Sequence, residues 1–248
     1  MNKTAIEWCD YTWNPVTGCK HGCPYCYARK IAERFKGSKA WPQGFEPMFR
    51  EERLKDPRKV GTQYYCPEYM ARGSTVFVCS MADLFGHWVP DSWINEVMLA
   101  AKGANRHTYI FLTKNPSRYL FLSGDSLLRE NFWFGTTAIG GDRPSLERID
   151  SLKKLTAPNK FISFEPLLGD PGDLDLTGIK QVIVGAQTNP TVIPSGDAIR
   201  SVVVAAKEAG AEVFFKNSME TVSWPGQSHF VNVHDLAWPL RKAAEVTD

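Results

Sequence analysis

Six short apolar runs rich in β-branched and aromatic residues recur along the chain, and they constrain its fold more than any other feature. They lie at residues 76–79, 109–112, 132–134, 161–164, 181–184 and 213–215. Amphipathic stretches separate them, with helices expected at 91–102, 144–155 and 201–208. Continuously apolar strands that alternate with helices are typical of parallel sheets, because helices cover both sheet faces. With an early strand at 6–8 or 11–13, the sequence predicts an α/β fold, a full or partial (β/α) barrel.

Length and composition fit one domain over residues 1–248, with an irregular insertion at about 38–75. The chain is 43% hydrophobic but has no apolar run long enough to span a bilayer, so we expect no membrane association. Residues 1–10 lack the apolar core of a signal peptide. We therefore expect a reducing, cytoplasmic location, where a disulfide is disfavoured.

Three cysteines, Cys19, Cys23 and Cys26, form a C-x3-C-x2-C motif between the early strand and a helix expected at 27–36, which Gly37 ends. Three thiolates can hold three irons of a 4Fe-4S cluster and leave the fourth iron open for a reactant. The alternative is a zinc site with His21 as fourth ligand. Structural zinc sites usually present two separated ligand pairs, and His21 would chelate with strain inside the loop. The spacing therefore favours the cluster.

This motif resembles the signature of the radical S-adenosylmethionine (SAM) superfamily. The resemblance implies that S-adenosyl-L-methionine chelates the fourth iron and that Tyr25, just before the third cysteine, flanks its adenine. It also implies an external electron donor such as flavodoxin or ferredoxin. Reduction would cleave the cofactor into methionine and a 5'-deoxyadenosyl radical, which abstracts hydrogen from the substrate. The protein's share is positioning and exclusion of solvent. The fold implied is a barrel of radical SAM type, with the cluster loop after the first strand.

Polar residues follow each expected strand, at what would be the catalytic end of a parallel barrel. Each can instead cap the next helix. Glu165 and Lys216 are the predicted catalytic residues, because charged groups after apolar strands are costly unless paired or used. Ser80, Asp83 and Thr136 are the predicted cofactor-binding residues beside Tyr25. The other residues directly after the expected strands are Met81, Thr113, Lys114, Thr137, Gln187, Thr188 and Asn217.

A closer resemblance extends across nearly the whole chain. The matching stretches are IEW at 6–8, TWNPVTGC at 12–19, CYA at 26–28, DLF at 83–85, LTK at 112–114, FEPLLG at 164–169 and FFK at 214–216. They resemble a phage-associated three-cysteine-motif family of radical SAM-like proteins. Two departures stand out. Many relatives have a longer gap between the first two cysteines, and this chain reads GAQT at 185–188 where they usually read GGES. The second departure replaces a carboxylate by Gln187, which suggests a specialised substrate.

Charge adds a second line of inference about the substrate. The first sixty residues carry twelve Lys and Arg against seven Asp and Glu, whereas the remainder carries seventeen against twenty. Within the insertion, basic side chains are interleaved with Trp41, Phe45, Phe49, Tyr64, Tyr65 and Tyr69. Aromatic and basic residues together are typical of single-strand and flipped-base binding. The alternatives are an ordinary solvated face and an insertion whose aromatics turn inward.

With the resemblance, these features favour a radical SAM enzyme that modifies a nucleobase in phage DNA by isomerising the substituent of a hypermodified thymine. Two alternatives remain open, a DNA photoproduct or lesion lyase and a zinc-stabilised DNA-binding accessory protein. Among the other cysteines, Cys79 is expected in the core, Cys9 near the cluster, and Cys66 in the insertion as a surface thiol or a hydrogen donor. The single histidines, His87, His107, His229 and His234, receive no catalytic role.

Overall fold

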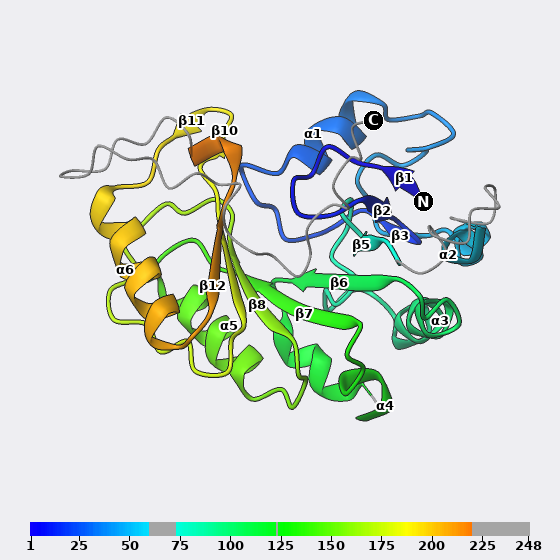
Figure 1. Cartoon of the computed structure of the whole chain (residues 1–248). Helices are drawn as coiled ribbons and strands as arrows, with labels where there is room; N and C mark the ends of the chain where they lie inside the picture. The colour runs from blue at the N-terminus through cyan, green and yellow to red at the C-terminus, as the bar shows by residue number, and fades with distance from the viewer. Residues whose placement is uncertain (60–72, 123, 220–248) are drawn as a thin grey trace, which may run out of the picture.

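The computed structural model describes residues 1–59, 73–122 and 124–219, and its centre is an eight-stranded sheet (Figure 1). Seven strands are parallel and neighbour one another in chain order, while β1 is antiparallel to β2 at one edge. Adjacent parallel strands in chain order require crossover connections of one hand. In sheet order, the strands are β1 (Asn2–Lys3), β2 (Tyr11–Trp13), β5 (Thr75–Val78), β6 (Thr108–Thr113), β7 (Phe132–Thr137), β8 (Lys160–Phe164), β9 (Gln181–Val184) and β12 (Glu212–Phe215).

All six apolar runs are confirmed as strands, and of the two candidates for an early strand only 11–13 is correct. Residues 6–8 form no strand, and Trp8 instead packs its ring against the sheet. In the described part of the chain the sheet is open, with β1 and β12 at its edges. The confirmed part of the expected fold is thus the α/β class with a mostly parallel sheet; closure into a barrel is not seen in those residues.

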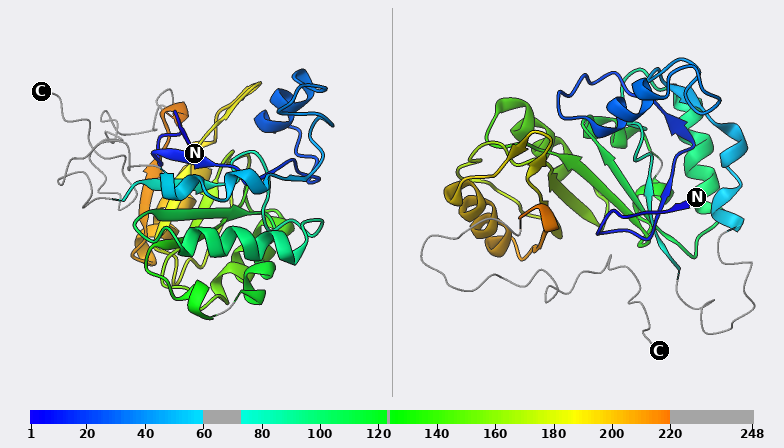
Figure 2. Two further views of the ribbon diagram at one scale, coloured as in Figure 1. Left: turned by 90° about the vertical axis from the view of Figure 1, so that its right-hand side faces the viewer. Right: turned by 90° about the horizontal axis from the view of Figure 1, so that it is seen from above.

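Helices α3 (Asp91–Lys102), α4 (Gly124–Leu127) and α5 (Arg143–Lys153) follow β5, β6 and β7, and α6 (Gly196–Glu208) precedes β12. They cover one side of the sheet (Figures 1 and 2). Helix α3 has the predicted bounds. Helix α6 begins five residues before the predicted start, because the Ser195 side chain caps it by accepting from the Ala198 amide. The 3-10 helix η2 (Pro116–Phe121) precedes α4. None of the described helices is both long and apolar enough to cross a bilayer.

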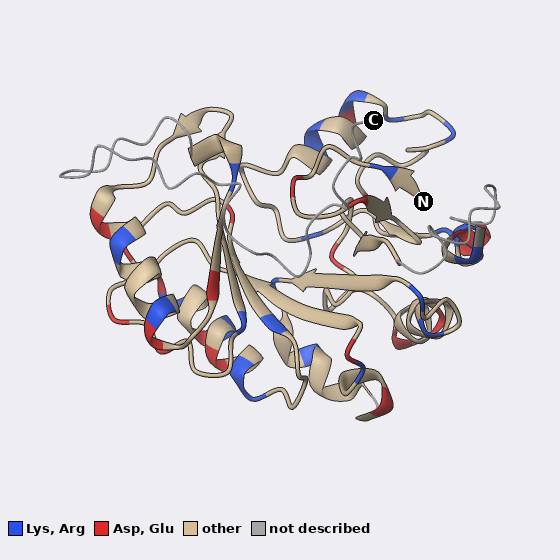
Figure 3. Cartoon of the chain, in the orientation of Figure 1, with Lys and Arg blue, Asp and Glu red and all other residues tan. Residues whose placement is uncertain are grey.

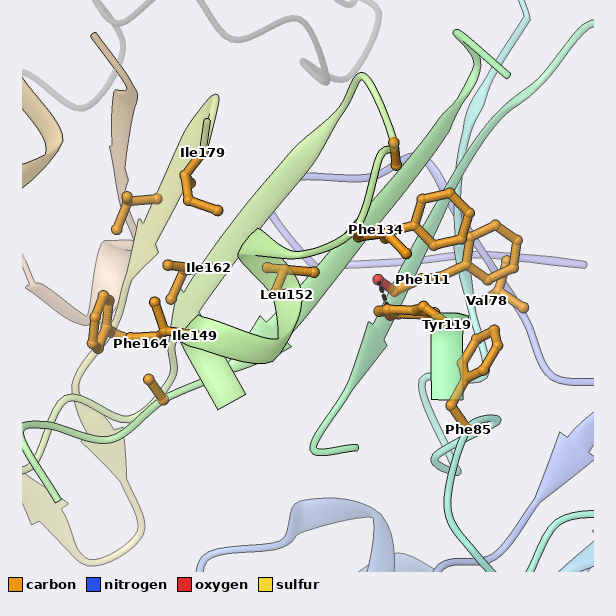
Figure 4. Close-up of a cluster of buried hydrophobic side chains, with 14 of the residues drawn as sticks. Val78, Phe85, Phe111, Tyr119, Phe134, Ile149, Leu152, Ile162, Phe164 and Ile179 are labelled. Atoms are coloured by element: carbon orange, nitrogen blue, oxygen red, sulfur yellow. Dashed lines mark hydrogen bonds between the residues drawn. The ribbon is translucent and has the colours of Figure 1, made fainter. Parts of the chain in front are cut away.

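Residues of each strand alternate between two hydrophobic cores, as the period of two requires. The larger core lies under the helices and includes Phe111, Phe134 and Ile162 (Figure 4). The Tyr119 hydroxyl ends in this core and donates to the carbonyl oxygens of Phe111 and Gly135. We call the opposite side of the sheet the inner face. It is lined by Phe77, Ile110, Trp133, Phe161 and Ile183 and is covered by Trp8 and Cys9.

The predicted insertion is more ordered than expected where the structure describes it. Strand β4 (Met48–Phe49) pairs with β3 (Val16–Thr17), and the 3-10 helix η1 (Glu51–Arg53) and helix α2 (Asp56–Lys59) follow. Phe45 is buried, and Phe49 stacks on Trp93, so these two aromatics pack inward as the structural alternative expects. Residues 60–72, which include Tyr64, Tyr65, Cys66 and Tyr69, lie outside the described residues, as do His229 and His234.

Candidate functional site

The cysteine loop leaves β3, passes through residues 18–26 and enters helix α1 (Tyr27–Arg34) above the carboxyl ends of the parallel strands (Figure 1). Gly18 fixes its start. The Gly18 amide donates to the Met81 carbonyl oxygen, its φ is +88°, and a Cβ at this position would overlap the backbone carbonyl of Glu46. Only glycine tolerates both conditions, so the loop is held against the segment that follows β5.

All three loop cysteines are free and partly buried. Cys26 caps helix α1, its Sγ accepting from the Arg29 amide at 3.4 Å, and the Arg29 guanidinium donates to the Cys19 carbonyl oxygen at 2.9 Å. Burial raises the pKa of the Cys19 thiol to about 12. In residues 1–59, 73–122 and 124–219, no three His, Cys, Asp or Glu side chains form a group that could hold a metal ion. The donor set itself, three free thiols on one short loop, suits an iron-sulfur cluster.

Asp83, on the segment after β5, anchors this loop. Its buried carboxylate pairs with His21 Nε2 at 2.7 Å and accepts from the Thr113 hydroxyl at 2.6 Å and from the Lys114 amide at 2.9 Å. Burial alone would raise the pKa of Asp83, but these bonds outweigh it and hold the pKa below its usual value. His21 also packs edge-on against Trp88. The structure therefore places Asp83, a predicted cofactor-binding residue, beneath the loop with both carboxylate oxygens engaged.

Tyr25 meets Lys114, which directly follows β6. The Lys114 ammonium donates to the Tyr25 hydroxyl at 3.3 Å and lies 5.6 Å from the centre of its ring. Burial lowers the pKa of Lys114, and the neighbouring Cys23 opposes that shift. Burial also raises the pKa of Tyr25 to about 12, with Cys23 acting in the same direction. A positive side chain therefore lies beside the cysteine loop.

The other two predicted cofactor-binding residues are placed differently. The Ser80 hydroxyl donates to the Asn14 side chain at 3.2 Å, and its backbone carbonyl accepts from Tyr27, the first residue of α1. Thr136 is fully buried, and its hydroxyl donates to the Thr113 carbonyl oxygen. It lies two residues after Phe134 in β7, so the alternation of the strand puts both on the helix-covered face. Ser80 thus supports the loop region, whereas Thr136 is turned away from the inner face.

Glu165 and Lys216, the predicted catalytic residues, form an ion pair of 2.8 Å after β8 and β12. Glu165 also accepts from the Trp8 indole at 3.2 Å. Burial alone would lower the pKa of Lys216, but the charge and hydrogen bond of Glu165 outweigh it and raise the pKa. Gly185, after β9, lies against both side chains of the ion pair. A Cβ at this position would crowd them, because it would lie 3.0 Å from Lys216 and 3.3 Å from Glu165.

Tyr27 ties the start of helix α1 to the segment after β5, and sequence reasoning missed it. Its hydroxyl donates to the Ser80 carbonyl oxygen at 2.8 Å, and burial raises the pKa of Tyr27 to about 12. Its place directly after the third cysteine was the available signal. By contrast, Gln187 lies in the hairpin of β10 (Gln187–Thr188) and β11 (Thr191–Val192), where its side chain donates to the Pro190 carbonyl oxygen.

The site therefore combines three free thiols, a lysine beside them and a Glu–Lys pair, all at the carboxyl edge of a parallel sheet. No curated protein and no solved structure matches the chain. One family profile, described as protein of unknown function (DUF5131), matches residues 3–229. Because that match covers most of the chain, the protein belongs to the DUF5131 family.

Proposed function

We propose that the protein is a radical SAM enzyme that modifies a nucleobase in DNA by isomerising the substituent of a hypermodified thymine, with phage DNA as the substrate. The observation that carries the enzyme class is the loop of three free thiols at the carboxyl edge of the sheet, with Lys114 beside it. The carboxyl edge of parallel sheets is where sites of such folds are built. The substrate rests on the basic first quarter of the chain and on resemblance.

In this proposal Cys19, Cys23 and Cys26 hold three irons, with S-adenosyl-L-methionine at the fourth. When bound, this pair of cofactors supplies a 5'-deoxyadenosyl radical. Asp83 and His21 keep the loop in place through their 2.7 Å contact. Lys114 offsets the negative charge of the thiolates, a neighbour effect that tunes cluster potentials. The Tyr25 ring flanks the adenine. Electrons come from flavodoxin or ferredoxin in a reducing cytoplasm.

Glu165 and Lys216 bind the substrate in this proposal. They present one carboxylate and one ammonium, and the Trp8 indole donates to the Glu165 carboxylate and so helps to orient it. A base substituent that carries one positive and one negative group could bind both residues, its positive group to Glu165 and its negative group to Lys216. The raised pKa of Lys216 keeps its ammonium charged at neutral pH, so that it donates hydrogen bonds and does not act as a base.

Reconstitution with iron and sulfide under anaerobic conditions tests the enzyme class. The protein is reduced with dithionite in the presence of S-adenosyl-L-methionine, and 5'-deoxyadenosine is measured by chromatography. We expect formation by the wild type and by Cys79→Ala, a matched control at a buried cysteine outside the loop. Cys23→Ala should fall to background while remaining folded, because the partly buried thiol serves the site rather than the core.

A colourless protein with stoichiometric zinc and no 5'-deoxyadenosine would contradict the enzyme class and support the zinc-stabilised accessory protein. For an active enzyme, mass spectrometry of digested modified DNA separates the reactions. Isomerisation leaves the nucleoside mass unchanged and shifts its retention time. Splitting of a thymine dimer into two bases would instead identify the lesion lyase.

A further inference from the structure

One side of helix α1 carries a half-exposed apolar stripe. Tyr27, Ile31 and Phe35 are 53%, 41% and 51% exposed. They are spaced four residues apart, which places them on one side of the helix. The opposite side packs inward through Ala28 and Ala32. Two half-exposed aromatic rings on one helix side indicate a surface that a partner covers.

The charge around this stripe is strongly positive. Residues 20–39 contain six Lys and Arg and a single acidic residue, Glu33. The Glu33 carboxylate is already engaged, because it accepts from the Phe45 amide at 3.2 Å. The Arg34 guanidinium lies 5.6 Å from the centre of the Phe35 ring, so cation and aromatic form one surface. Figure 3 shows basic residues at both ends of α1, with one acidic position between them.

We propose that this face of α1 binds an unpaired stretch of DNA, with bases stacked on Tyr27 and Phe35 and phosphates contacting Lys30, Arg34 and Lys36. The inference rests on the proposed function, which makes DNA the substrate. Aromatic rings together with Lys and Arg are how proteins bind single strands. Positions 27 and 35 lie about 12 Å apart along the helix axis, which leaves room for about two bases stacked between their rings at ~3.4 Å spacing.

The position of the stripe explains why a strand bound there would reach the site. Tyr27 directly follows Cys26, and its hydroxyl donates to the carbonyl oxygen of Ser80, on the segment after β5. A base next to Tyr27 would therefore lie beside the end of the cysteine loop. A duplex offers no free base face for stacking, so the surface selects unpaired DNA. An apolar peptide or a second copy of this basic face would leave the Lys and Arg charges without partners.

Fluorescence anisotropy of a labelled 15-nucleotide single strand, measured with the full chain and no cofactor, tests the proposal. Because stacking contributes about 1–3 kcal/mol per base, Phe35→Ser should raise Kd at least fivefold. Arg34→Glu should also weaken binding and flatten its dependence on salt. The matched controls are Phe121→Ser, a side chain 83% exposed on η2, and Arg143→Glu on α5. Both controls should bind like the wild type, and the matching duplex should bind more weakly than the single strand.

Equal losses in Phe35→Ser and Phe121→Ser would overturn the proposal, as would equal affinity for duplex and single strand. A dimer in light scattering that Phe35→Ser dissociates would assign the stripe to a second copy instead. The result is separable from the proposed function, since binding is measured without cofactor. If the wild type forms 5'-deoxyadenosine and Phe35→Ser binds the single strand as the wild type does, the DNA-binding role of α1 is contradicted and the enzyme class is not. Phe35-dependent binding without cofactor cleavage leaves the surface standing and contradicts the enzyme class.

Discussion

The amino and carboxyl ends of the parallel strands, here called the amino and carboxyl edges of the sheet, differ in the partners of several buried or half-buried polar side chains. At the amino edge, Lys160 donates to the carbonyl oxygens of Lys153 and Leu155, Asn159 donates to that of Glu130, and His107 pairs with that of Pro57. These side chains satisfy backbone groups at the ends of helices and loops. Their arrangement holds the fold together.

At the carboxyl edge, side chains bond to one another. The pairs His21–Asp83, Tyr25–Lys114 and Glu165–Lys216 are all of this kind, and the first two involve residues of the loop that carries the three thiols. Such contacts between side chains are the minority in proteins. If the proposed site lies at the carboxyl ends of the strands, substitutions at the two ends should have separable effects, on stability at the amino ends and on activity at the carboxyl ends.

The largest effect is expected for Gly18→Ala. The new methyl group would overlap the Glu46 backbone and displace the start of the cysteine loop. Bound iron after anaerobic reconstitution should fall to background. Gly22→Ala is the control, because Gly22 also has a positive φ, +69°, but no atom lies near its Cβ position. It should cost about 1–2 kcal/mol of local strain and still load iron. Equal loading of both variants would show that loop placement does not matter.

A second test compares lysines at the two edges. Lys216→Met should lower turnover about a hundredfold with iron content unchanged, because it removes one partner of the Glu165 pair. Glu165→Gln should do the same, and the double variant should lose little more, since the two act as a unit. Lys160→Met should instead lower the free energy of unfolding by about 1–3 kcal/mol and leave turnover per folded molecule intact. Stability loss in Lys216→Met without a rate effect would make the pair structural.

The amino edge also predicts a dependence of stability on pH. His107 Nδ1 accepts from the Ser74 amide at 3.2 Å, which requires a neutral ring, and burial lowers the pKa of His107 below its ordinary value of 6.5. The unfolded chain therefore takes up the proton first. The contribution of His107 is complete above pH 6.5 and is lost as the pH falls below that value.

Urea unfolding of the wild type and of His107→Gln at pH 7.5 and 5.5 measures this contribution. The wild type should lose more stability than the variant over that interval, by on the order of 1 kcal/mol. Parallel losses in both proteins would assign the acid sensitivity to other groups.

The smallest effect is expected for Tyr25→Phe, which removes the hydroxyl that accepts from Lys114 but keeps the ring. One hydrogen bond of about 0.5–1.5 kcal/mol predicts a two- to tenfold rise in the KM for S-adenosyl-L-methionine. Tyr25→Leu removes the ring and should raise KM further if the ring flanks the adenine. Identical KM values for the two variants would show that the Tyr25 ring does not contact the adenine and that only its hydrogen bond with Lys114 matters.

Much of the scaffold was predictable because its signals are local. The six strands were located from apolar runs, and α3 from Asp91 and Gly103. The early strand was ambiguous because both 6–8 and 11–13 are apolar and aromatic; pairing of 11–13 with β5 decided it. Helix α6 was placed too short because Ser195, its cap, lies beyond the clearly periodic stretch. Whether the sheet closes into a barrel depends on whether the first and last strands pair with each other, and no local sequence signal shows this.

The α/β class, the positions of the strands along the chain and the placement of three cysteines on one loop follow from the amino-acid sequence, because periodicity and spacing are properties of neighbouring residues. Which polar residues meet depends on the three-dimensional arrangement of the strands and loops. It joined Asp83 to His21 and Glu165 to Lys216, and it turned Thr136 into the helix-side core. These outcomes depend on strand pairing and on which face each side chain takes. Contacts between residues far apart in the chain have no local signal.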